Sequence, residues 1–177
     1  MQTFRLIPYP ADSLPKIDIT GEIIRSGNNF LLHYEVNSGS DQILLPAKAS
    51  TPSRVDNLWK ATCFEFFLAI PNQTGYWEFN MSPSGDWNVY KMDAYRRVGF
   101  REEAAFTQLP FVFRKTDKKL SLDISLDISP ILQPQQTMQV GITAIIQTED
   151  RNETYWSLAH SGPQADFHLR ESFILSM

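Results

Sequence analysis

The sequence predicts an all-β protein: an antiparallel β-sandwich, of the jelly-roll or immunoglobulin-like kind, with few or short helices. Apolar residues rarely recur at the spacing of three and four that marks an amphipathic helix, and 11 prolines are scattered along the chain. Runs with strand character are frequent, and turn-forming residues separate them. We expect roughly eight to eleven short strands in a single domain that covers residues 1–177.

Two pairs of strands are expected as hairpins. Residues 17–25 and 30–36 flank Ser-Gly-Asn-Asn, in which Gly27 and the asparagines tolerate positive φ. Residues 111–115 and 120–128 flank Thr-Asp-Lys-Lys, and the latter run alternates Leu or Ile with Ser or Asp. One face of that strand is therefore expected to be buried and the other to be wet.

Three further segments complete the element order. The run 138–147 carries Ile and Val on both faces, which is typical of a central strand. Residues 149–154 read as a polar turn, and a short helix is expected near residues 94–105.

The segment 59–100 holds 11 of the 22 aromatic residues, which are 12 Phe, 6 Tyr and 4 Trp in the whole chain. Strands are expected at 63–68, 76–81 and 87–92, with a short loop joining the first two. Side chains alternate between faces along a strand, so Phe64, Phe66, Leu68, Trp77, Phe79 and Met81 form a core set. The opposite face carries polar groups, namely Glu65, Glu78 and Asn80, with Tyr90 on the next strand.

This polar face is the candidate site. Carboxylate and amide groups beside aromatic rings suit a polyhydroxylated ligand such as a carbohydrate, and Trp87 and Trp156 are expected to supply a stacking wall. Arg54 and Arg97 are expected to hold or balance the carboxylates. In a structural alternative, Arg54, Arg96 or Arg97 neutralises the two glutamates inside a closed interior.

The residues LWKATCFEFFL at 58–68 and YWEFNMSPSGDWNVYKMDAYR at 76–96 resemble the DOMON-like domain family, which is related to the family 9 carbohydrate-binding modules. YWSLAHSGPQADFH at 155–168 is similar to a second hallmark of that family. The resemblance implies a twisted antiparallel sandwich that binds a sugar or haem. It places the family's strand glutamate at Glu65, and its Glu-x-Asn at Glu78 and Asn80.

Other chemistries remain open at this stage. Haem would need a methionine and a histidine as axial ligands, from Met81, Met92 or Met138 and from His33, His160 or His168. We expect no cofactor and no metal site, and interpret His160, Asp166 and His168 as loop anchors that border the pocket. A glycoside hydrolase would use Glu65 and Glu78 facing each other at ~5 Å between Cβ atoms. A structural or interaction domain is the remaining alternative.

Charge and cysteine content restrict the partners. A net charge of −4 argues against general nucleic-acid binding. No apolar run approaches the ~20 residues of a membrane helix, and the N-terminus lacks a secretory pattern. One cysteine, Cys63, permits no intrachain disulfide, so a cytoplasmic location is expected. An exposed edge strand would allow a monomer or a homodimer.

Overall fold

The computed structural model describes residues 1–37, 43–96 and 99–177. These residues form twelve β-strands and two short 3-10 turns, and they contain no α-helix. The strands are β1 (Gln2–Pro8), β2 (Asp18–Ser26), β3 (Asn29–Asn37), β4 (Cys63–Ala69), β5 (Tyr76–Met81), β6 (Trp87–Met92), β7 (Arg101–Glu102), β8 (Phe111–Lys115), β9 (Lys119–Asp127), β10 (Gln139–Gln147), β11 (Glu153–Ser157) and β12 (Leu175–Ser176). The 3-10 turns are η2 (Leu58–Lys60) and η3 (Arg170–Ser172). The predicted all-β class is confirmed.

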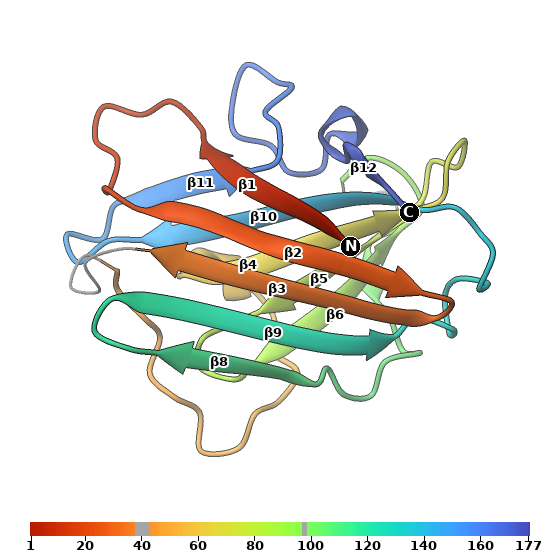
Figure 1. Ribbon diagram of the computed structural model, residues 1–177, viewed down its shortest axis with the longest axis horizontal. Coiled ribbons are helices and arrows are strands. Elements are labelled where there is room, and N and C mark those ends of the chain that lie inside the picture. Colours follow the sequence, from red (N-terminus) through yellow and green to blue (C-terminus); the bar gives the residue numbers. More distant parts are fainter. Residues whose placement is uncertain (38–42, 97–98) are drawn as a thin grey trace.

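All strands belong to one curled antiparallel sheet in the order β7-β6-β5-β4-β10-β11-β1-β2-β3-β9-β8, with β12 also pairing with β10. Strand β1 connects the two layers, because Gln2 to Leu6 pair with β2 whereas Ile7 and Pro8 pair with β11. The layer β1-β2-β3-β9-β8 therefore lies across the layer of β4, β5, β6, β10 and β11 (Figure 1). This arrangement is a β-sandwich.

The main core fills the space between the layers. Phe66 of β4 stacks on Phe79 of β5 at 4.3 Å between ring centroids, and on Phe30 of the opposite layer at 5.0 Å. All six members of the predicted core set lie in this cluster. Period-two alternation places every second aromatic side chain of β4 and β5 toward the facing sheet, where burial of each ring contributes roughly 1.5–3 kcal/mol.

The other face of the β4–β5–β6–β10 layer is also covered. Phe67, Tyr76 and Met92 form a second apolar cluster there with Phe167 and Phe173 of the C-terminal segment. Every residue of β4 and β5 is consequently buried. This second covered face, which a two-layer sandwich would leave open to solvent, is where the candidate site lies.

Most predicted strands are confirmed within one or two residues, including both hairpins and the central position of β10. The expected helix near residues 94–105 is wrong, because the described part of that segment consists of turns and β7, which pairs with β6. The polar turn at 149–154 is shorter than expected, because β11 begins at Glu153. Among the described residues, no helix combines the length and apolarity needed to cross a membrane.

Candidate functional site

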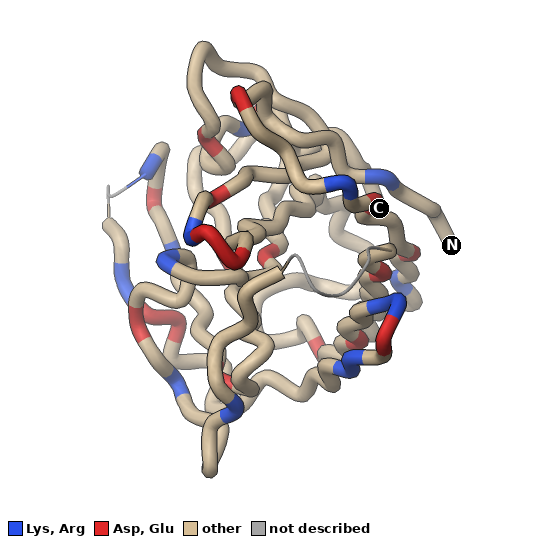
Figure 2. Tube along the Cα trace, turned by 90° about the vertical axis from the view of Figure 1, so that its left-hand side faces the viewer, with Lys and Arg blue, Asp and Glu red and all other residues tan. Residues whose placement is uncertain are grey.

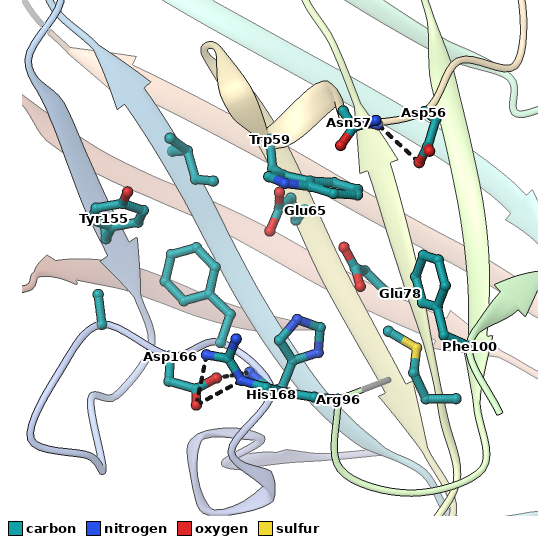
Figure 3. A pocket seen from close by; sticks show the side chains of 14 residues that line it. Asp56, Asn57, Trp59, Glu65, Glu78, Arg96, Phe100, Tyr155, Asp166 and His168 are labelled. Carbon is teal, nitrogen blue, oxygen red and sulfur yellow. Dashed lines mark hydrogen bonds and ion pairs between the residues drawn. The ribbon is translucent and has the colours of Figure 1, made fainter. Parts of the chain in front are cut away.

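A cavity of about 670 Å³ opens over the outer face of β4, β5 and β10 (Figure 3). Its walls come from five parts of the chain: the segment before β4, the strands β4, β5 and β6, the β6–β7 connection, the strands β10 and β11, and the C-terminal loop. The lining residues are Asp56, Asn57, Trp59, Glu65, Glu78, Met92, Arg96, Phe100, Ile145, Tyr155, Ala165, Asp166, Phe167 and His168.

Two carboxyl groups form the floor. Glu65 pairs across the ladder with Asn80, and Glu78 pairs with Phe67, so both glutamates lie on the same face of the sheet. They occupy diagonal positions rather than the directly opposed ones expected from the sequence, because the β4–β5 register is offset by two residues. Diagonal neighbours on adjacent strands are about 7–8 Å apart, whereas directly opposed residues have Cβ atoms ~5 Å apart. Both side chains are recessed, with 2% and 5% of their surface exposed.

Glu65 lacks a full set of partners. The Thr143 hydroxyl donates to Glu65 Oε2 at 3.3 Å, whereas Oε1 is buried without a hydrogen-bond partner among the described residues. Burial raises the pKa of this carboxyl well above its ordinary value, and the nearby charge of Glu78 raises it further. An unpaired buried oxygen costs free energy, so this atom is a candidate contact for a water molecule or a ligand.

Glu78 is held by an amide. Asn80 donates its Nδ2–H to Glu78 Oε1 at 2.7 Å. Burial raises the pKa of Glu78 from 4.5 to about 7, although the hydrogen bond from Asn80 lowers it in part. Two carboxyls with raised pKa values at the floor of one cavity are typical of functional sites.

No cation neutralises these carboxyls among the residues that the structure describes. Arg54 donates instead to Asn88 Oδ1 at 2.7 Å and to the carbonyls of Glu103 and Phe106, and it stacks over the Trp87 ring at 4.4 Å. The expected pairing of Arg54 with Glu65 or Glu78 is therefore not found. Arg97 lies outside the described residues.

Arg96 is the lining residue that carries a positive charge. Its guanidinium forms an ion pair with Asp166 at 3.0 Å, and Asp166 also accepts from the Tyr95 hydroxyl. Asp166 is almost fully buried, with 3% of its side chain exposed, whereas 46% of Arg96 is exposed. Along the rest of the chain basic and acidic residues are interspersed (Figure 2).

Aromatic rings form the rim. Trp59 projects from η2 over Glu65, and Phe100 lies beside Glu78 (Figure 3). Both pack against Tyr90: Phe100 stacks on its ring at 4.7 Å, and Trp59 meets it edge-on at 5.8 Å. Phe100 remains 43% exposed, and both Phe100 and Trp59 line the cavity.

Trp87 and Trp156 do not line this cavity. Their side chains point into the main core, where they are 7% and 4% exposed. The parity of β6 and β11 explains this, because Trp87 pairs with Met81 and Trp156 pairs with Ala144, both of which belong to the core face. The aromatic wall of the cavity is therefore formed by residues other than the two tryptophans predicted from the sequence.

Tyr90 and Asn80 lie beside the floor glutamates on the same face of the sheet, where Asn80 pairs with Glu65 and Tyr90 pairs with Glu78. The Tyr90 hydroxyl donates to Asp56 Oδ1 at 2.5 Å and accepts from Asn88 Nδ2 at 2.9 Å. These two hydrogen bonds link the lining residue Asp56 to Tyr90 and Asn88 of β6. Neither Tyr90 nor Asn80 lines the cavity itself.

The two predicted loop histidines have different places. His168 lines the cavity, and its Nδ1 lies 2.9 Å from the Tyr76 hydroxyl. Burial lowers the pKa of His168 to about 4, so its imidazole is neutral near pH 7. His160 contacts the Ile7 carbonyl at 2.9 Å and packs on Tyr9, away from the cavity.

Of the methionines weighed as haem ligands, Met81 and Met138 are buried in the main core, and Met92 lines the cavity. The described residues contain no group of three or more His, Cys, Asp or Glu side chains arranged to hold a metal ion.

Several lining residues were not singled out from the sequence. Tyr155 and Phe167 lie in the segment 155–168, which was quoted for its family resemblance but gave neither residue a role, although Tyr155 alternates with buried neighbours in β11. Asp56 and Phe100 belong to connections whose path no sequence pattern fixes. Alternation within 153–157 was the available signal for Tyr155.

No protein-family model matches the chain, and no curated protein matches it in sequence. Solved structures share its fold. A proposed carbohydrate-binding protein from Bacteroides uniformis superposes with a TM-score of 0.71 at 15% identity, over 97% of this chain and 83% of the other. A family 9 carbohydrate-binding module from Caldicellulosiruptor kristjanssonii, in complex with glucose, has a TM-score of 0.53 at 13% identity, over 93% and 78%. A complex of such a module from the same organism with cellotriose has a TM-score of 0.52 at 12% identity, over 87% and 71%.

Proposed function

We propose that this protein is a non-catalytic ligand-binding domain for a carbohydrate or a similar polyhydroxylated small molecule, and that the ligand binds in the cavity above Glu65 and Glu78. The fold supports the proposal, because its architecture is that of the family 9 carbohydrate-binding modules. The cavity volume of about 670 Å³ falls within the usual range of small-molecule sites, roughly 300–1,000 Å³.

One observation carries the proposal. Two buried carboxyls from neighbouring strands lie at the floor of a cavity, and their partners among the described residues leave Glu65 Oε1 unsatisfied. Carboxyl oxygens accept hydrogen bonds from hydroxyl groups, and the faces of Trp59 and Phe100 suit the C–H face of a sugar ring. A ring stacked on the rim would direct its hydroxyls toward the floor.

Calorimetric titration with glucose and with cellotriose tests the assignment. The Glu78→Ala variant should lose affinity at least tenfold, whereas Glu22→Ala, on an exposed position of β2, should bind like the parent protein. Circular dichroism spectra would establish that both variants are folded. Equal sugar affinity of the parent protein and Glu78→Ala would contradict the assignment. A Soret band after haem addition would instead support the haem-binding alternative.

A further inference from the structure

The charge balance of the cavity defines the ligand more closely. Among the described residues, four acidic side chains line it, Asp56, Glu65, Glu78 and Asp166, against one cation, Arg96. Arg96 is engaged by Asp166 at 3.0 Å. Three carboxyl groups consequently face one cavity without a cation partner among the described residues.

The two floor carboxyls are in an unusual position for acidic groups. Buried carboxylates in proteins are nearly always paired with a cation or fully hydrogen-bonded. Glu65 is 2% exposed, yet its Oε1 has no partner in the part of the chain that the structure describes. A neutral hydroxyl would satisfy that oxygen without favouring the ionised form of either glutamate, since it adds no charge, whereas a cation would stabilise both carboxylates.

The rim provides the second requirement of a cation site. Trp59 overhangs Glu65, and Phe100 lies beside Glu78 (Figure 3). The negative face of an aromatic ring attracts an ammonium group within about 6 Å of its centroid. A cation that enters between the rings therefore meets aromatic faces at the mouth and carboxyl oxygens at the floor.

Resting on the proposed function, we infer that the preferred ligand carries a protonated amine, as an amino sugar does, and that the ammonium group lies between Glu65 and Glu78. A primary ammonium has three N–H donors, enough to reach Glu65 Oε1 and one oxygen of Glu78 at once. Hydrogen bonds between an ammonium and a carboxylate are about twice as strong as those between neutral groups. An acetamido sugar lacks this charge and also adds bulk at the recessed floor.

Titration of the full chain with glucosamine, glucose and N-acetylglucosamine near pH 7 tests the inference. Glucosamine should bind at least tenfold more tightly than either neutral sugar. Glu65→Gln and Glu78→Gln keep the side-chain size and remove the charge, so each should reduce the ratio of glucosamine to glucose affinity to near one. Glu22→Gln, exposed on β2, should leave the ratio unchanged.

The outcomes separate the two proposals. Equal affinity for glucosamine and glucose would overturn the ammonium site while the carbohydrate assignment stands. A tenfold preference that survives in both glutamine variants would also overturn it, because the cation would then lie elsewhere. Binding of none of the three sugars would overturn both proposals.

Discussion

Removal of the Glu78 charge is expected to stabilise the protein above neutral pH. Burial raises the pKa of this carboxyl from 4.5 to about 7, which means that the fold disfavours its ionised form. Glu78→Gln keeps an oxygen that accepts from Asn80 Nδ2 and never ionises. A buried residue that weakens the fold when it is charged is typical of a functional site rather than of a stabilising contact.

The magnitude follows from the pKa difference. At 1.36 kcal/mol per pH unit, a rise from 4.5 to about 7 corresponds to about 3 kcal/mol between the two protonation states. Between these values the native state holds a proton that the unfolded chain has released. The contribution to stability is therefore fully present below pH 4.5 and is lost as the pH rises through about 7.

Urea unfolding of the parent protein and Glu78→Gln at several pH values measures this effect. The two unfolding free energies should nearly coincide at pH 4, and the variant should be more stable by up to about 3 kcal/mol at pH 8. The difference between the two proteins reports the titration of Glu78 together with its effect on Glu65, because the Glu78 charge raises the pKa of that neighbour. A difference that does not change with pH, or a variant less stable at pH 8, would refute the reasoning.

The remaining predictions concern the rim and the core. Trp59→Ala should weaken sugar binding about tenfold with little change in melting temperature, because this half-buried ring packs only at the cavity edge; an unaltered titration curve would count against it. Trp87→Ala should leave binding nearly intact but cost about 3–5 kcal/mol in urea unfolding, and a smaller loss than 1 kcal/mol would contradict its core placement. Phe66→Ala should lower the free energy of unfolding by about 3–5 kcal/mol in the same urea assay, because its ring stacks on Phe79 of its own layer and on Phe30 of the opposite layer. Gly21→Ala should yield no folded protein by circular dichroism, since the added Cβ would lie 1.9 Å from the His33 carbonyl oxygen; soluble, folded protein would show that the strands can separate there.

The sequence predicted the fold well because period-two alternation acts locally. Leu120, Leu122 and Ile124 alternate with polar residues, and β9 has the expected buried and exposed faces. The same parity placed Glu65 and Glu78 on one face of the sheet, as the structure has them. Alternation depends only on neighbouring residues, so a single sequence is enough to read it.

The alternation of residues along a strand could not predict which residues form the cavity wall. Alternation separates the two faces of a strand, but it does not say which face a distant segment covers. The C-terminal loop brings Phe167 and His168 onto the outer face of β4 and β5, which buries that face as well. Trp87 and Trp156 were assigned to the wall by residue type, whereas the parity of their strands places them in the core.

Nuclear magnetic resonance of the indole N–H groups tests the central claim most directly. The protein has 4 tryptophans, all within the described residues, and of these Trp59 alone lines the cavity above Glu65 and Glu78. When glucosamine or glucose is added, we predict that the Trp59 indole signal moves with saturation while those of Trp77, Trp87 and Trp156 stay in place. A ligand-dependent shift confined to the other three indoles would contradict this account of the site.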